Sequence, residues 1–154
     1  MNDTDLKNRT KLFALQTIRL VESLPRSVAA DVLGRQVLRS ATSVAANYRS
    51  ACRAKSRADF ISKMGTVEEE ADESGLWFEL LGESGIIAVD RVADLLRESG
   101  ELTAIAVSSI RTAREHSTAV TPVSPNPQPA VRKPQSTSGS SANPQSAVRN
   151  PQST

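Results

Sequence analysis

Proline is almost absent from the first 118 residues of this chain. Seven of its eight prolines lie at or beyond Pro122, and Pro25 is the exception. Because proline has no backbone N–H and interrupts helices, a long stretch without it can form uninterrupted helices. Aromatic residues make up only 3% of the chain, which suits packed helices better than a β-sandwich. The sequence therefore predicts an all-α fold.

Four amphipathic segments predict an antiparallel up-down-up-down four-helix bundle. Pro25 ends the first segment, Ser27 is a suitable N-cap for the second, and Gly85 is a suitable stop for the third. Ser56 and Asp59 stand at capping-box spacing at the start of the third segment. Connections this short make neighbouring helices antiparallel. The expected helices span residues 5–24, 27–53, 57–83 and 90–115.

The C-terminal part of the chain has a different composition, dominated by Pro, Ser, Gln and Asn. Such a segment buries too little apolar surface to offset the entropy of ordering. We therefore expect a disordered tail at 119–154, after a bundle domain at 1–118. The segment NPQPAVRKPQST at 126–137 returns as NPQSAVRNPQST at 143–154. This repeat is either a short linear binding motif or a duplication in an unconstrained tail.

Charge is segregated along the chain, although the net charge is only +2. Residues 1–57 hold 11 Lys or Arg against 4 Asp or Glu, whereas residues 58–118 hold 5 against 13. The remaining residues hold 3 basic side chains and no acidic ones. Segregated charge is informative about binding partners rather than about fold.

The second expected helix carries arginines on the face opposite its apolar stripe. At 100° per residue, its arginines fall within about 40° of one line, directly away from the core. Arginine presents a planar fork that matches phosphate oxygens, so this face predicts sequence-independent binding to an RNA or DNA backbone. The alternative is a solvated face, or one paired with acidic residues of another helix. We call this set the arginine ridge: Arg35, Arg39, Arg49, Arg53 and, past the turn, Arg57.

The third expected helix combines an acidic cluster at 68–73 with two apolar arcs. Carboxylates can bind a divalent cation, but the Glu-x-x-His signature of bundle metal sites is absent. We therefore expect no metal site, and instead pairing of the cluster with the arginine ridge, within the chain or between copies. Trp77 and Leu80 lie outside the main apolar stripe. They predict either an oligomer interface or packing of Trp77 under the 82–90 connection.

The chain offers no set of residues suited to catalysis. It has one His, one Cys and no Gly-rich phosphate loop, so we expect neither an enzyme nor a bound cofactor. Cys52 is expected to be a small buried residue, and Gly100 to mark a kink or a tight helix crossing. No apolar run approaches the ~20 residues of a membrane span, and the N-terminus lacks a secretory signal pattern. A cytoplasmic protein with no membrane partner is expected.

Several short motifs between residues 33 and 81 resemble a known protein family. They are Gln36-x-x-Arg39, Ser43-x-x-x-Asn47, Lys55-Ser56 before Asp59-Phe60-Ile61, and the acidic EEEADES at 68–74. With these motifs the chain resembles, over about residues 5–115, the bacterial four-helix-bundle proteins encoded in intervening sequences of 23S rRNA genes.

This resemblance implies a closed up-down bundle with a non-enzymatic role. The accessory proteins of diversity-generating retroelements are similar, and they form pentameric rings that bind nucleic acid and a reverse transcriptase. By that similarity, the arginine ridge contacts nucleic acid, and the partners are nucleic acid, further copies of the chain in a homo-oligomer such as a pentamer, and a reverse transcriptase or another protein. The alternative is a protein–protein adaptor without nucleic-acid binding, anchored by Trp77 or the tail repeats.

Overall fold

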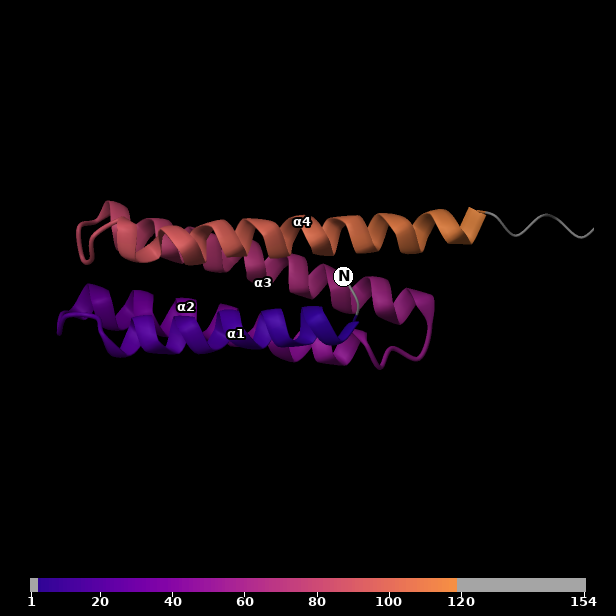
Figure 1. Cartoon of the computed structure of the whole chain (residues 1–154), viewed down its shortest axis with the longest axis horizontal. Coiled ribbons are helices and arrows are strands. Elements are labelled where there is room, and N and C mark those ends of the chain that lie inside the picture. Colours follow the sequence, from indigo (N-terminus) through magenta and orange to yellow (C-terminus); the bar gives the residue numbers. More distant parts are fainter. Residues whose placement is uncertain (1–2, 119–154) are drawn as a thin grey trace, which may run out of the picture. The chain divides into compact units, whose positions relative to one another are not determined.

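The computed structural model describes residues 3–118, with the side chains of residues 4–115. The chain divides into the units Met1–Thr121 and Pro122–Thr154, and every described residue belongs to the first. The tail predicted at 119–154, with its repeats, lies outside the described residues. The helices of the described part are α1 (Asp3–Glu22), α2 (Val28–Ala51), α3 (Arg57–Glu83) and α4 (Asp90–Thr118) (Figure 1).

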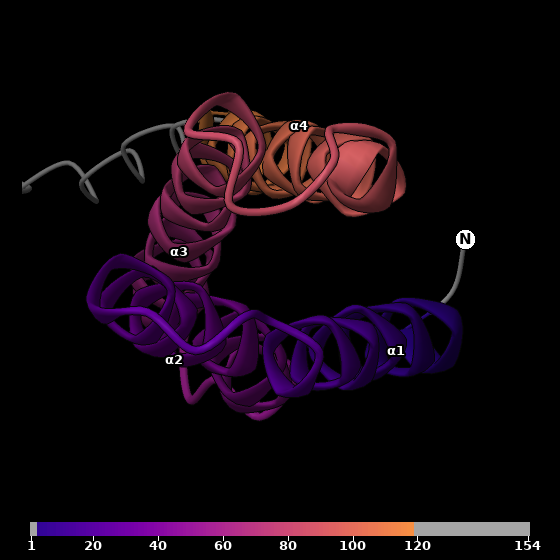
Figure 2. The same cartoon turned by 90° about the vertical axis from the view of Figure 1, so that its left-hand side faces the viewer.

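The predicted all-α four-helix bundle is confirmed for the described residues. Consecutive helices run antiparallel, so the α1–α2 and α3–α4 connections lie at one end and the α2–α3 connection lies at the other (Figure 1). Figure 2 shows the helices in the order α1, α2, α3, α4 around the bundle. Extensive contacts join α2 to α3 and α3 to α4, whereas α1 and α4 touch sparingly.

Two sets of side chains hold α1 against α3 and α4. Phe13 and Phe78 are both 0% exposed, and their rings meet edge to face with centroids 6.1 Å apart. Arg9 donates from Nε to Glu98 Oε1 at 2.6 Å and from Nη2 to Glu98 Oε2 at 2.8 Å. Arg9 also pairs with Glu101, and these hydrogen bonds raise the pKa of its guanidinium above the ordinary range. These contacts add to the other buried apolar residues of α1, which belong to the core shared by all four helices.

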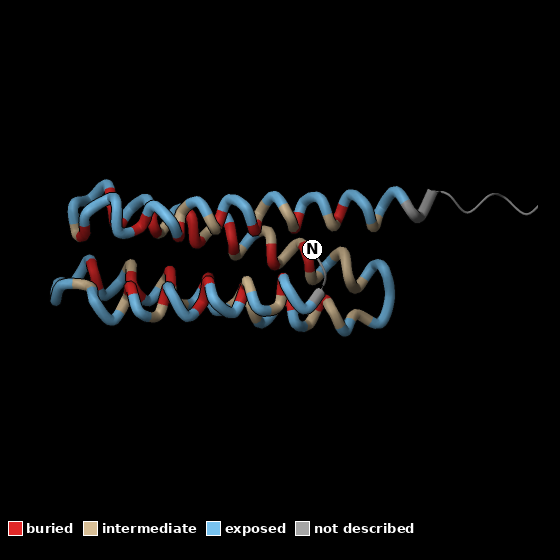
Figure 3. Tube along the Cα trace, in the orientation of Figure 1, coloured by how far each residue is buried: buried red, intermediate tan, exposed pale blue. Residues whose placement is uncertain are grey.

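The hydrophobic core runs along the inner faces of all four helices (Figure 3). On α2 the buried apolar residues recur at helical spacing, opposite to the face that carries the arginines. This is the stripe that the sequence pattern predicts. Its buried members are Val37, Ala41, Val44, Tyr48 and Ala51.

The close helix approach lies at a different glycine from the one predicted. A Cβ atom added to Gly75 would lie 3.1 Å from Ser99 Oγ, so the absence of a side chain there lets α3 approach α4. Around Gly100 a Cβ would meet nothing within 4 Å. The expectation of a tight crossing at Gly100 was wrong because this residue lies on an exposed part of α4.

Side-chain caps define the starts of α2 and α3, as the sequence predicts. Ser27 Oγ accepts from the Ala30 N–H at 3.1 Å, and Ser56 Oγ accepts from the Asp59 N–H at 3.1 Å. The carboxylate of Asp59 accepts in return from the Lys55 N–H at 2.9 Å. That hydrogen bond, with Lys63 nearby, lowers the pKa of Asp59 below its ordinary 3.8. Its stabilising contribution is therefore present at neutral pH and is lost as the pH falls through the lowered pKa.

Removal of the Ser56 cap is expected to destabilise the bundle by about 1 kcal/mol, because Ser56→Ala leaves the first turn of α3 without a side-chain acceptor. Urea unfolding followed by circular dichroism measures the change. Ser62→Ala is the matched control, since Ser62 is exposed inside the same helix, and its effect should stay within about 0.5 kcal/mol. Equal effects of the two substitutions would contradict the capping role.

Candidate nucleic-acid interface

The N-terminal half of the arginine ridge is occupied by carboxylates of the same chain. Arg35 makes two hydrogen bonds to Asp31, at 3.2 Å from Nε and 2.5 Å from Nη2, which raises the pKa of Arg35. Arg39 Nη2 lies 2.5 Å from Glu73 Oε1, and its Nη1 lies 3.9 Å from Glu70 Oε1. The predicted pairing between the ridge and the acidic cluster of α3 is therefore confirmed within the chain for Arg39.

The pairing of Arg39 belongs to a polar network between α2 and α3. Ser43 Oγ donates to Glu70 Oε1 at 2.9 Å, and Asn47 Nδ2 donates to the Ser43 backbone oxygen at 3.0 Å. The second oxygen, Glu70 Oε2, is buried and accepts no hydrogen bond from the described residues. Two residues of the family-like motif of α2, Arg39 and Ser43, thus contact α3, which spacing along one helix could not reveal.

The C-terminal half of the ridge has a different environment. Arg49 is exposed in the last turn of α2, and Arg57 is exposed as the first residue of α3. Arg53 was expected inside the second helix, but α2 ends at Ala51 and Arg53 lies in the connection. The nearest arginines of the two halves, Arg39 and Arg49, are about 15 Å apart along the helix axis at 1.5 Å per residue. The ridge is therefore two separate groups rather than one continuous row.

We call the second group the basic turn, consisting of Arg49, Arg53, Lys55 and Arg57. All four side chains are exposed, and no acidic residue occurs between positions 49 and 57. Within the described part of the chain, none of these four side chains forms an ion pair. The nearest acidic residue in sequence, Asp59, pairs with Lys63 at 3.1 Å and accepts a hydrogen bond from the Lys55 N–H. Lys55 was not among the residues predicted for the site, although its place among the basic residues at 49–57 was the available signal.

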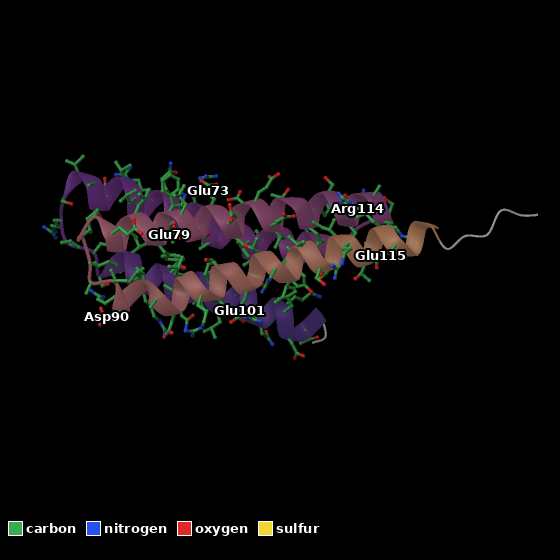
Figure 4. The ribbon with its side chains drawn as sticks, turned by 90° about the horizontal axis from the view of Figure 1, so that it is seen from above. Glu73, Glu79, Asp90, Glu101, Arg114 and Glu115 are labelled. Atoms are coloured by element: carbon green, nitrogen blue, oxygen red, sulfur yellow. The ribbon has the colours of Figure 1, made fainter. Side chains whose placement is uncertain are left out.

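A groove of about 700 Å³ lies beside the basic turn. The α2–α3 connection forms one wall and the C-terminal part of α4 forms the other, with Arg57 among the lining residues. Cys52 also lines this groove and is half-buried. Cys52 was expected to be a small buried residue, and as the C-cap of α2 it is partly buried and packs against the core. Figure 4 shows Arg114, next in sequence to the lining residue Ala113, at this end of α4.

Trp77 and Leu80, the two residues predicted at an oligomer interface, differ in their surroundings. Trp77 is half-buried, packs against the core, and donates from Nε1 to Glu73 Oε1 at 3.1 Å. Leu80 is 38% exposed, and Leu76, one turn earlier, is 48% exposed. Leu76 was not predicted at this surface, because the helix pattern does not show which side of α3 is covered by α4.

No three His, Cys, Asp or Glu side chains within the described helices gather as metal ligands would. None of the helices among residues 3–118 has the length and apolarity needed to cross a bilayer.

Together, the helix order and the exposed basic turn define an all-helical, antiparallel four-helix-bundle protein with a cationic end. The model of the 23S rRNA-intervening sequence protein family matches residues 2–108, and the chain belongs to this family. Among solved structures it is similar to a protein of unknown function from the S23 ribosomal protein family of Bacteroides thetaiotaomicron VPI-5482. Identity is 34% with a TM-score of 0.67, and the match covers 72% of this chain and 99% of that chain. No significant match was found among curated proteins.

Proposed function

We propose that this protein is a non-enzymatic, cytoplasmic homo-oligomer that binds nucleic acid through the basic turn. The observation that supports the proposal best is the contrast between the two halves of the arginine ridge. Arg35 and Arg39 are paired with carboxylates of the same chain, whereas Arg49, Arg53 and Arg57 are exposed and pair with none of the described acidic groups. Only the second group is open to an external anion without breaking an existing ion pair.

The chemistry of the basic turn suits a phosphate backbone. Three guanidiniums and an ammonium within nine residues can contact successive phosphates, and such contacts release counterions. The binding would be largely independent of sequence, because contacts to phosphates carry no direct information about bases. The family description refers to the 23S rRNA intervening sequence, which makes RNA the first ligand to test.

The test is RNA binding by a variant that lacks the arginines of the basic turn. We expect Arg49→Ala/Arg53→Ala/Arg57→Ala to bind a fluorescent 20-nucleotide RNA at least tenfold more weakly in an anisotropy titration. The slope of log K against log salt should fall in magnitude by about 2, since each lost contact to single-stranded RNA removes about 0.7.

The control removes the same charge from the other end of the bundle. Arg19, Arg26 and Arg97 are exposed, and Arg19→Ala/Arg26→Ala/Arg97→Ala should bind RNA nearly as tightly as the unaltered protein. An equal loss in both variants would mean that net charge, and not the basic turn, determines binding. Unchanged binding in the basic-turn variant would contradict the proposed site.

The alternative function is that of a protein–protein adaptor whose basic turn binds an acidic protein. The ion pairs of Arg35 with Asp31 and of Arg39 with Glu73 support this alternative, because they show arginines of this surface engaging carboxylates. It predicts no RNA binding by the unaltered protein and tight binding to an acidic protein instead.

Self-association is supported by apolar side chains that remain exposed on α1, α2 and α3. Isolated exposed residues of this kind are normal, but neighbouring ones on one helix face are suited to contact between copies. The pairs with the highest exposure on each helix are Leu12 and Leu15, Val28 and Val32, and Leu76 and Leu80.

A further inference from the structure

The groove beside the basic turn has the chemistry of a nucleobase site. Phe60 and Ile105 supply apolar surface on opposite walls, and Ser108 supplies a hydroxyl group on the α4 wall. Ser108 makes no side-chain hydrogen bond within the described residues, so its hydroxyl can serve a ligand. The volume of the groove, about 700 Å³, lies in the range of small-molecule sites, about 300–1,000 Å³. Apolar and aromatic walls with a few polar groups suit a flat ring that carries nitrogen and oxygen atoms, such as a nucleobase.

Arg57 connects this groove to the basic turn, because it belongs to the turn and also lines the groove. A phosphate held by Arg53 or Arg57 would bring the attached nucleotide to the mouth of the groove. In a duplex the bases are stacked and paired inside the helix, so only an unpaired base could turn into the groove. The required ligand is therefore single-stranded.

We infer that the groove binds an unpaired base of single-stranded RNA whose phosphates lie on the basic turn. This inference rests on the proposed function and specifies the form of nucleic acid that the site selects. RNA is favoured over DNA because the hydroxyl on the groove wall can pair with a ribose 2′-hydroxyl as well as with a base edge. An acidic peptide could form an ion pair with Arg57. Apolar side chains of such a peptide in the groove would, however, give the Ser108 hydroxyl no hydrogen-bond partner.

The first test blocks the groove without changing charge. The unaltered protein should bind a 20-nucleotide RNA strand at least tenfold more tightly than the same RNA as a duplex. Ser108→Trp places a large ring in the groove and should reduce this ratio to about one. Ala104→Trp, at an exposed position of α4 outside the groove, should preserve the ratio.

A DNA strand of the same sequence should bind to the unaltered protein more weakly than the RNA strand. Equal binding of the two strands would overturn the assignment to RNA.

The second test uses the unaltered protein and its single cysteine. Cys52 lines the groove, so a saturating RNA strand should slow alkylation of its thiol by iodoacetamide at least fivefold, whereas saturating duplex should not. Equal affinity for strand and duplex, together with unchanged alkylation, would overturn the base site and leave the basic turn as the RNA contact. Absence of binding to either form would overturn the proposed function itself. Protection of Cys52 by a poly-glutamate peptide but not by RNA would identify a protein ligand and overturn both.

Discussion

Replacement of Phe78 with Ala is expected to lower the free energy of unfolding by about 3–5 kcal/mol. Phe78 is 0% exposed and meets Phe13, also 0% exposed, edge to face. The substitution removes the apolar surface of the ring, leaves a cavity, and abolishes the aromatic contact that joins α3 to α1. Since a small domain has a total stability of only about 5–15 kcal/mol, this loss is a large fraction. Thermal and urea unfolding would measure it.

Phe60 provides a matched control for Phe78. It lies on the same helix, but its ring is only partly buried and borders the groove. Phe60→Ala should therefore cost clearly less stability than Phe78→Ala. Equal costs would show that the aromatic pair between α1 and α3 does not contribute as the packing indicates.

Replacement of Leu81 with Ala is expected to cost about 2–5 kcal/mol, because its side chain is 0% exposed within the core. The adjacent Leu80 provides the comparison, since it is 38% exposed. Leu80→Ala should cost no more than about 1.5 kcal/mol, because part of its surface already faces water. The two substitutions make the same chemical change at consecutive positions, so the larger loss in unfolding free energy is expected at the more buried position, Leu81.

Leu80→Ala also tests the predicted interface around Trp77 and Leu80. If this surface joins copies of the chain, the variant should have a lower average mass in size-exclusion chromatography with light scattering, while its circular dichroism stays unchanged. An unchanged mass in a self-associating protein would place the contact elsewhere, for example at Val28 and Val32, which are 85% and 54% exposed.

Most of the fold could be predicted because its signals are local. Ser27 and the pair Ser56 and Asp59 mark helix starts through hydrogen bonds to backbone groups three residues away. Pro25 marks a break for equally local reasons. Gly85, with φ of 72°, adopts the left-handed conformation that glycine allows after a helix. Each of these features depends on a few neighbouring residues, so one sequence was sufficient.

The candidate site was harder to predict because its properties depend on distant segments. Helical spacing correctly predicted that Arg35, Arg39 and Arg49 are exposed on α2. It could not show the partners of Arg39, which lie 31 and 34 residues later on α3. The groove walls come from residues near 55 and near 108, and spacing along α2 contains no information about α4. The position of Arg53 was also mispredicted, because no Gly or Pro before it marks the end of α2 at Ala51.

The sparse contact between α1 and α4 has a consequence for how the molecule opens. Partial unfolding begins where the fewest interactions must be broken together, and such units commonly coincide with single elements of the fold. The direct contacts between α1 and α4 include the ion pairs of Arg9 with Glu98 and Glu101. Ion pairs of this kind weaken as the salt concentration rises. We therefore expect α1 to detach first, leaving α2, α3 and α4 as a temporary three-helix intermediate.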